Sequence, residues 1–391
     1  MTRSLCLRML RVGLVCAGLV CAGWALLLAN IVFGDLNQDE GWYLYAARMV
    51  SLGEMPYRDF AYTQGAVMPF VYSLAQPFVR MHGLLAGRLF TVVLGFAGAL
   101  TAAWLAARLV GPGKRRDERW DAALLAFMLI LVNVHQTYYY AVVKTYALTA
   151  LFLVAGFLVL SVALDRRNRL AAVLSAALLV LAAGTRTSVG IVLPIVFVFL
   201  CFQRNSRAFH CWLYFALGGL LSACVVVLPF LLMAPENFWF WVVKYHTSRE
   251  AGHIWQRQRL IYMAGSLSRQ LGAYFVAVAL WLAVVAGQWF QRRKQDMRSE
   301  PVSLLGLLKK LLNLNGIIWV SVVAVTLVHL FAPFPYDDYQ VLVFPLFAVA
   351  VSAMAVRFVC RMKDLLPGSR TVPASAAESN VEPAPDEIRA G

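Results

Sequence analysis

The chain has 391 residues, of which 61% are hydrophobic and only 14% are charged. Soluble domains have about 45–50% apolar and about 25% charged residues, so this composition excludes a soluble globular enzyme, and the high apolar content also excludes a disordered chain. A net charge of +15 would favour a nucleic-acid partner in a soluble protein. In an apolar chain, however, basic residues are typical of the cytoplasmic loops of a membrane protein. We therefore expect membrane lipids, and no nucleic acid, as partners.

The N-terminus combines three arginines with a long apolar run. Arg3, Arg8 and Arg11 come before or at the start of the apolar residues 12–33. A cleaved signal peptide has an apolar region of about 7–15 residues, and this run is longer. The N-terminal segment is therefore predicted to be an uncleaved membrane anchor.

Further apolar runs are long enough to predict membrane-crossing helices along most of the chain. They cover residues 84–109, 121–141, 145–164, 170–183, 189–202, 211–233, 270–290, 316–332 and 341–359. The region 170–202 is too long for one helix across an apolar core of about 30 Å. The polar residues 184–188 interrupt it, so we predict two short helices there.

The distribution of charge sets the expected topology. With the N-terminus in the cytoplasm, most Lys and Arg residues fall on the cytoplasmic side, as the positive-inside bias requires. The expected fold is an all-α polytopic membrane protein with about ten transmembrane helices, and amphipathic juxtamembrane helices in the first outer loop. Both termini are then cytoplasmic.

The domain organisation follows from the same pattern. We expect one transmembrane domain over residues 1–363, with long outer loops at 34–83 and 234–269, and a disordered cytoplasmic tail at 364–391 that is rich in Pro, Ala, Ser and Glu. The leucine-rich stretch 303–316 is typical of an interfacial helix.

The first outer loop begins with an acidic pair. Asn37 or Asp39 can cap a helix over residues 40–52, and a second amphipathic segment covers 67–79. Both are expected to lie parallel to the bilayer. Capping and the helix dipole explain an acid at the start of a helix without any chemistry, so Asp39 and Glu40 on their own fit a structural and a catalytic role about equally.

The residues around this pair resemble a known family. The stretch 38–60 is similar to the first-loop signature of the GT-C membrane glycosyltransferases, the bacterial relatives of protein O-mannosyltransferases and aminoarabinose transferases. The matching residues are Asp39, Glu40, Tyr43, Tyr45, Ala46, Ala47, Pro56, Tyr57, Asp59 and Phe60.

This resemblance implies an activity and its partners. It implies a polyprenyl-phosphate-linked sugar donor, transfer at the outer face of the membrane, and a lipid, glycan or protein acceptor. The first acid of the pair, Asp39, is implied to be the base or a contact for a divalent cation, Mg²⁺ or Mn²⁺, with Glu40 beside it. The chain contains no Asn-x-Ser/Thr sequon, which favours a bacterial inner membrane over a eukaryotic secretory origin.

The implied reaction needs positive charge, because its leaving group is a lipid phosphate. The candidates for binding the donor phosphate are Arg58, Lys144, Arg186, Lys244 and Arg249. Arg88, Arg257 and Arg259 are further outer-side cations. Contact with lipid head groups is the alternative explanation for most of them. That alternative is weakest for Arg186, which lies between two short apolar helices, where an unused charge is costly.

Other polar residues are candidates for a donor or acceptor groove. They are Tyr43, Asp59, Tyr62, Gln64, His246, Asp337 and Asp338. The two aspartates fit a solvated turn as well as they fit a site. His246 and His253 give too few ligands for a zinc site, which usually has three or four.

Two positions depart from the aminoarabinose transferase pattern. Lys144 stands where that branch commonly has a second acid, and the stretch 62–65 lacks a lysine that precedes a proline in that branch. A second catalytic acid therefore comes from elsewhere in the chain or is absent.

Three other classes fit parts of the pattern. A lipopolysaccharide ligase or polysaccharide polymerase also has about ten spans and an outer loop with Arg and His, but it needs no acidic pair after the first span. A membrane transporter would show repeated broken helices, whereas the interruption at 184–188 has no clear counterpart. A non-catalytic scaffold would leave the acidic loop unexplained.

Overall fold

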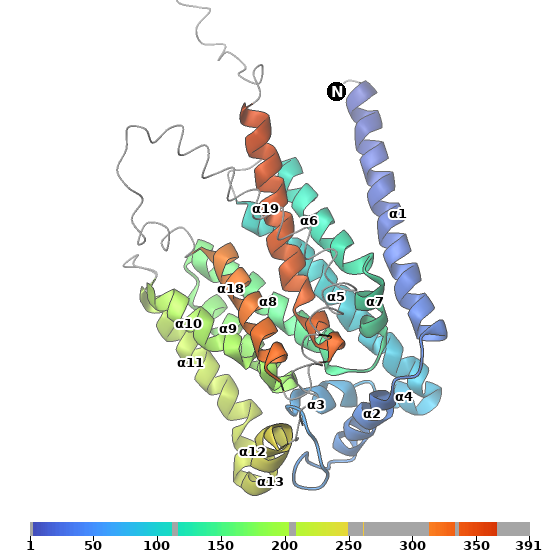
Figure 1. Ribbon diagram of the computed structural model, residues 1–391, viewed down its shortest axis with the longest axis vertical. Coiled ribbons are helices and arrows are strands. Elements are labelled where there is room, and N and C mark those ends of the chain that lie inside the picture. Colours follow the sequence, from blue (N-terminus) through green and yellow to red (C-terminus); the bar gives the residue numbers. More distant parts are fainter. Residues whose placement is uncertain are drawn as a thin grey trace, which may run out of the picture.

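The computed structural model describes residues 3–111, 116–202, 209–248, 261, 313–332 and 336–365. Within these residues every regular element is a helix, as expected for the fold class, and the only extended pairing is an isolated bridge between Pro56 and Phe60 (Figure 1). The expected span 270–290, residues 303–312 of the interfacial stretch 303–316 and nearly all of the tail fall outside the described residues.

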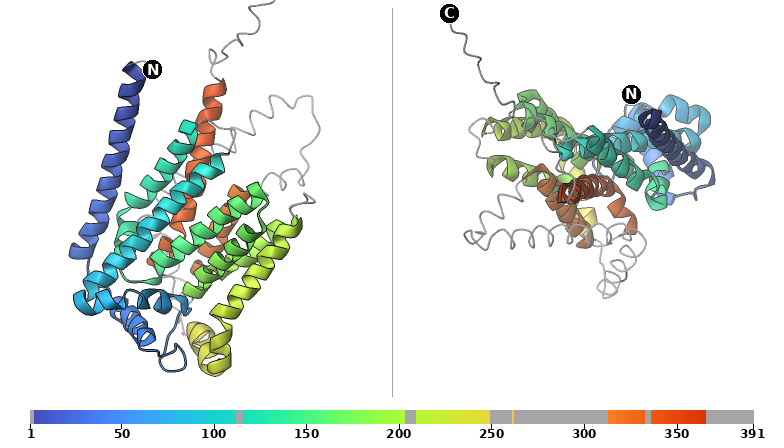
Figure 2. Two further views of the ribbon diagram at one scale, coloured as in Figure 1. Left: turned by 180° about the vertical axis from the view of Figure 1, so that it is seen from behind. Right: turned by 90° about the horizontal axis from the view of Figure 1, so that it is seen from above.

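The body of the molecule is a bundle of apolar helices. Its members are α1 (Arg3–Phe33), α5 (Leu84–Val110), α6 (Arg116–Leu131), α7 (Val134–Ala141), α8 (Thr145–Arg166), α9 (Arg169–Thr185), α10 (Val192–Phe202), α11 (Phe209–Val226), α18 (Leu314–Leu330) and α19 (Phe344–Leu365). The N-terminal half of α1 stands apart from the other helices (Figure 2). Small residues allow close packing elsewhere. A Cβ on Gly95 of α5 would lie 2.7 Å from the ring of Tyr140, and one on Gly156 of α8 would lie 2.7 Å from Leu179.

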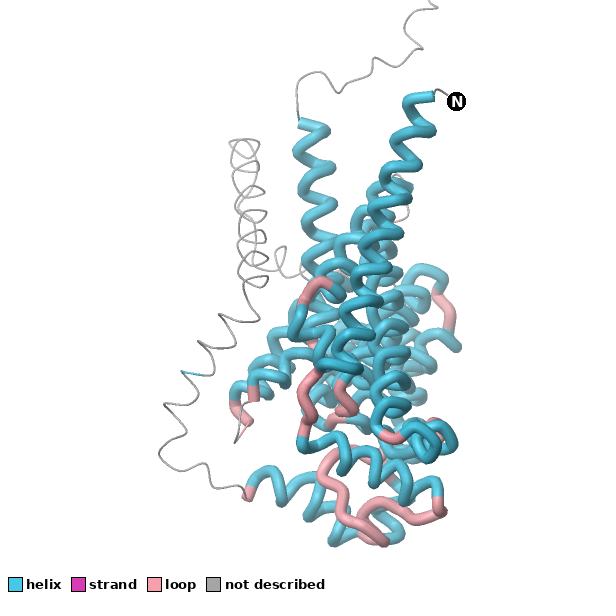
Figure 3. The backbone as a smooth tube through the Cα atoms, turned by 90° about the vertical axis from the view of Figure 1, so that its right-hand side faces the viewer, coloured by secondary structure: helices cyan, strands magenta, loops and turns pink. Residues whose placement is uncertain are grey.

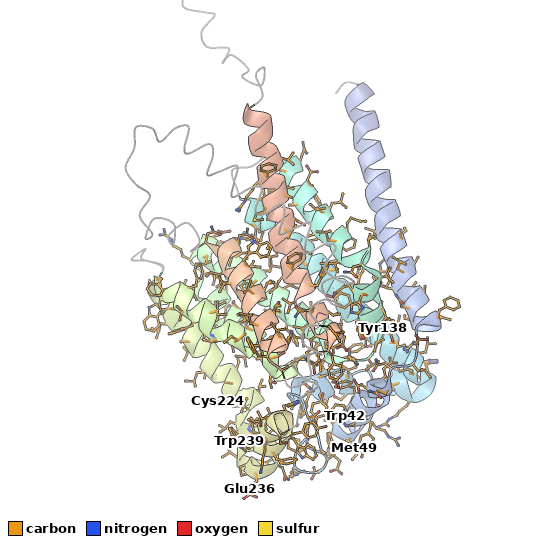
Figure 4. All side chains as sticks on the ribbon, viewed as in Figure 1. Trp42, Met49, Tyr138, Cys224, Glu236 and Trp239 are labelled. Carbon is orange, nitrogen blue, oxygen red and sulfur yellow. The ribbon has the colours of Figure 1, made fainter. Side chains whose placement is uncertain are left out.

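Short helices form a layer at one end of this bundle. They are α2 (Gln38–Ser51), α3 (Val67–Ser73), α4 (Gln76–His82), α12 (Leu228–Met233), α13 (Pro235–Trp239), the π-helix η2 (Phe240–Lys244) and α14 (Tyr245–Thr247). Figure 3 shows the loops that join several of them at this end. Trp42 and Met49 of α2, and Glu236 and Trp239 of α13, are labelled in this layer in Figure 4.

The first loop folds largely as its sequence predicts. Helix α2 begins at Gln38, and Asn37 is its N-cap: the Asn37 side chain accepts a hydrogen bond from the Asp39 N–H, and Glu40 accepts one from the Asn37 N–H. This capping box leaves the Asp39 side chain free of the capping role. The predicted helix 67–79 is instead two helices, α3 and α4, separated at Leu74 and Ala75.

Helices α5 and α8 are long and apolar enough to cross a membrane. Up to four spans result if two bent pairs of helices are each counted as one: Val20–Phe33 with Gln38–Ser51, bent by 91°, and Asp117–Leu131 with Val134–Ala141, bent by 71°. The apolar helices indicate a membrane protein, whereas the expected ten spans are not confirmed. Several of the expected spans are helices of only 10–17 residues in the described chain, and about 20 residues are needed to cross a bilayer.

The expected interruption within 170–202 is present. Helix α9 ends at Thr185, Arg186 has an extended backbone, and the 3₁₀ helix η1 (Thr187–Ile191) leads into α10. The first loop meets α9 just before this interruption, because a Cβ on Gly65 would collide with the carbonyl oxygen of Gly184. Glycine is therefore required at position 65 for the two backbones to approach.

Candidate functional site

Glu40 is bound on all sides. Its carboxylate pairs with Arg88 through two hydrogen bonds, from Nε to Oε1 at 2.9 Å and from Nη2 to Oε2 at 2.7 Å. It also accepts a hydrogen bond from the Val143 N–H. Arg88 donates further bonds to the carbonyl oxygens of Ile31, Gly34 and Asp35. The two side chains are 1% and 4% exposed, so this pair joins α1, α2, α5 and the link after α7 and offers little to a substrate.

Asp39, the neighbouring residue, is in a different position. Its side chain is 42% exposed, and its Oδ2 lies 3.0 Å from the Nζ of Lys144. The same Nζ lies 3.0 Å from the Oδ2 of Asp338, whose side chain is 8% exposed. Asp338 belongs to the 3₁₀ helix η3 (Asp337–Leu342), so residues distant in sequence meet at one ammonium group. We call Asp39, Lys144 and Asp338 the carboxylate–lysine cluster.

Lys144 lies in the short link between α7 and α8, as the N-cap residue of α8. Burial lowers the pKa of this lysine, but the carboxylates of Asp338 and Asp39 outweigh that effect, and the pKa is raised from its ordinary value. Lys144 is therefore charged at neutral pH. Asp338 depends on that charge, because its other oxygen, Oδ1, is buried without a hydrogen-bond partner in the described part of the chain.

Arg186 lies beside this cluster at the C-terminal end of α9. It is 7% exposed and donates a hydrogen bond from Nη1 to the Thr145 hydroxyl at 3.2 Å. Its guanidinium lies over the rings of Tyr146 at 5.0 Å and Tyr339 at 4.4 Å. Lys144 also lies over the Tyr146 ring, at 5.6 Å. Tyr146 is thus shared by the two cations, and cation–π attraction stabilises both charges away from bulk water.

Aromatic residues of the first loop adjoin these groups. Tyr43 of α2 is 5% exposed and lies in an edge contact with Tyr62, which is fully buried and stacks on Trp42. Burial raises the pKa of Tyr62, so its hydroxyl stays protonated. That hydroxyl has no hydrogen-bond partner among the described residues.

Four other expected site residues of the two long outer loops have local partners. Arg58 pairs with Asp59 at 2.7 Å, and Asp59 also accepts the Met55 N–H. Gln64 contributes its carbonyl oxygen to the Tyr57 hydroxyl, and His246 bonds the Thr63 carbonyl through Nε2. These contacts organise the loop.

Three further candidates were expected in the later outer loops. Lys244 is exposed on the π-helix η2. Arg249 and the side chain of Asp337 lie outside the described residues.

Several residues near the cluster have no role in the sequence prediction. They are Thr145, Tyr146, Tyr339 and His329. His329 of α18 is 1% exposed and shares a hydrogen bond of 2.8 Å with Ser188. A polar residue inside an apolar run is the signal that could have identified His329 and Thr145, since such residues are costly within a membrane unless they are used.

The donor set does not fit a divalent cation on Asp39. The ammonium of Lys144 already lies between the two carboxylates that a metal would use. The part of the chain that the structure describes contains no group of three or more His, Cys, Asp or Glu residues that could hold a metal ion.

No family model matches the chain, and no curated protein matches it. The functional assignment therefore depends on the chemistry of the residues themselves. A partly exposed carboxylate such as Asp39 can accept a proton, and the buried cations Lys144 and Arg186 can stabilise an anion.

Proposed function

We propose that the chain is a GT-C-type glycosyltransferase of a bacterial inner membrane, with about ten spans and both termini in the cytoplasm. It transfers a sugar from a polyprenyl-phosphate donor to a lipid, glycan or protein acceptor at the outer face. The observation that supports this proposal best is the carboxylate–lysine cluster. Asp39 is 42% exposed at the start of α2, and it lies 3.0 Å from a buried lysine.

Asp39 is the proposed general base. The acceptor hydroxyl gives its proton to the Asp39 carboxylate while its oxygen bonds to the anomeric carbon, and the bond from that carbon to the lipid phosphate breaks. Glu40, by contrast, is enclosed by Arg88 and two backbone N–H groups, so we assign it a positioning role for the start of α2.

Lys144 and Arg186 are proposed to bind the phosphate that leaves. In the described residues Arg186 makes one hydrogen bond through its guanidinium, to Thr145, and a guanidinium has five N–H donors. The remaining donors suit phosphate oxygens, and burial strengthens such an interaction. Tyr43 and Tyr62 are the nearest groove candidates, whereas the mutual pairing of Arg58 with Asp59 gives those two a weaker claim.

The test is transfer of labelled sugar from polyprenyl phosphate donors to endogenous acceptors in reconstituted vesicles. Donor lipids that co-purify with the protein, identified by mass spectrometry, define which sugar to supply. Asp39→Asn should lower the rate by about 10²–10⁴-fold, because it removes the base and keeps the shape. Asp165→Asn is the matched control, since Asp165 pairs with Arg108 and is 60% exposed at the far end of α8. Equal rates for the two variants would refute the catalytic role of Asp39.

Arg186→Ala separates donor binding from the proton transfer. We expect a higher donor KM with an acceptor KM that stays close to the wild-type value, because the guanidinium is assigned to the donor phosphate. An unchanged donor KM would remove Arg186 from the site.

A further inference from the structure

The resemblance to GT-C enzymes implies that Asp39 is the base or a contact for a divalent cation, and the geometry around Asp39 disagrees with the second of these roles. The Nζ of Lys144 is 3.0 Å from Asp39 Oδ2 and 3.0 Å from Asp338 Oδ2. A cation that bridges two acidic side chains is the arrangement that a bound metal would produce, and here the chain supplies the cation itself.

We propose that the ammonium group of Lys144 is the resident cation of this site and replaces a divalent metal ion. The inference deepens the proposed function, on which its meaning for catalysis rests. It also predicts a binding property that does not depend on activity: the wild-type cluster excludes Mg²⁺ and Mn²⁺, and removal of the lysine head admits them.

The lysine is fixed at this position by its surroundings. Its backbone is extended, with φ −139° and ψ 172°, immediately before α8 begins. The rings of Tyr139 and Tyr146 both lie 5.6 Å from Nζ, and the side chain is 9% exposed. Moving the ammonium into water would therefore break two ion pairs and two cation–π contacts at once.

A metal ion cannot share the position. Mg²⁺ binds oxygen at about 2.0–2.1 Å and Ca²⁺ at about 2.3–2.6 Å, so an ion between these carboxylates would lie on or beside the lysine nitrogen. Two like charges at that separation repel strongly, and more so where water is largely excluded.

The ammonium also retains capacity for a substrate. An ammonium group has three N–H donors, and the two carboxylates use two of them. With Arg186 at the same Tyr146 ring, the third donor provides the cationic contact to a leaving phosphate that a metal would otherwise supply.

The experiment measures Mn²⁺ binding to the purified full-length protein in nanodiscs by electron paramagnetic resonance. Wild type and the control Lys244→Ala, which removes an exposed lysine, should show the same weak, nonspecific binding. Lys144→Ala should gain one site with an affinity at least about tenfold tighter, because two carboxylates then face an empty position. The gain should disappear in Lys144→Ala with Asp338→Asn.

Stability gives a second measurement and guards against a variant that folds poorly. Lys144→Gln keeps most of the side-chain volume and removes the charge. Mn²⁺ or Mg²⁺ should raise the melting temperature of Lys144→Ala or Lys144→Gln, and EDTA should reverse that rise. Neither reagent should move the melting temperature of the wild type.

Two results of the binding and stability measurements would overturn the inference. One is specific Mn²⁺ binding by the wild type that Asp39→Asn abolishes. The other is no gain of binding or stability in either Lys144 variant. If the Lys144 variants gain the metal site but no sugar is transferred, the inference holds and the proposed function fails. If transfer occurs and EDTA abolishes it, the proposed function holds and the inference fails.

Discussion

Two neighbouring acids of the first loop have opposite environments. Glu40 is 1% exposed, and Arg88 and backbone N–H groups satisfy it completely. Asp39 is 42% exposed and has one ion pair, with a lysine that a second acid shares. The two acids of this short motif therefore have different roles. The satisfied acid holds four segments together, and the incompletely bound acid remains available for chemistry.

The largest expected effect is on stability, in the Glu40–Arg88 pair. Arg88→Leu leaves a buried carboxylate without its partner, so we expect a loss of about 3–5 kcal/mol in the free energy of unfolding. Denaturant titration in mixed micelles measures it. Arg80→Leu is the matched control, because Arg80 is exposed on α4 and bonds only the Ser51 hydroxyl among the described contacts. A loss below about 1 kcal/mol for Arg88→Leu, the range of surface pairs, would contradict the structural role of the pair.

Removal of the Lys144 ammonium group should lower the free energy of unfolding by a smaller amount. Lys144→Met deprives the buried Asp338 of its ion pair, whereas Asp39 can be solvated, so we expect a loss of about 2–3 kcal/mol. The double variant Lys144→Met with Asp338→Asn should recover part of that loss, since no buried charge then lacks a partner. If the double variant loses more free energy of unfolding than the two single variants lose together, the ion pair does not stabilise this position.

Asp39→Asn should scarcely affect folding. The ion pair is partly exposed, and such pairs contribute about 1 kcal/mol or less. The same substitution is expected to abolish most transfer activity, so stability and activity separate at Asp39, whereas Glu40→Gln should lower both. Thermal unfolding recorded on the samples used for the transfer assay provides the comparison. A loss of several degrees in Asp39→Asn alone would place Asp39 in the same structural class as Glu40.

The smallest effect concerns the exposed pair Arg58–Asp59. The hydrogen bond from Arg58 holds the pKa of the Asp59 carboxyl well below its usual range. Because the folded-state pKa is depressed, the contribution of this pair is present above the unfolded pKa and is lost as the pH falls towards the folded value. Carboxyl NMR of a selectively labelled sample should show Asp59 titrating below ordinary aspartates, with a return towards normal in Arg58→Gln and in high salt.

The sequence predicts the helices better than it predicts their ends. The apolar runs that became α5 and α8 contain no interruption, so their bounds are close to those expected. The run 121–141 contains Asn133, which caps α7 by accepting the Gln136 N–H and produces the bend after α6. The run 211–233 contains Pro229, which starts the separate helix α12 after Val227. Hydrophobicity alone ignores these local hydrogen-bonding and backbone effects.

The sequence identifies the charged residues of the site, but it does not predict which of them contact one another. Asp39, Lys144, Arg186 and Asp338 each stand out as charges close to apolar segments. Which acid meets which base depends on how η3 and α9 pack against α8, and no spacing in the chain encodes that. The tyrosines are harder to predict, because nothing in the sequence distinguishes Tyr146 and Tyr339, whose rings contact the Arg186 guanidinium, from other core tyrosines.

The contact between Gly65 and Gly184 closes one route between the first loop and the end of α9. A single methyl group on Gly65 would collide with the carbonyl oxygen of Gly184. Two residues after Gly184, Arg186 donates a hydrogen bond to the Thr145 hydroxyl. The first loop and the C-terminal end of α9 are therefore in direct backbone contact at this point. A polyprenyl donor of the proposed kind could therefore not pass between these two segments, and its path to the cluster would have to run elsewhere.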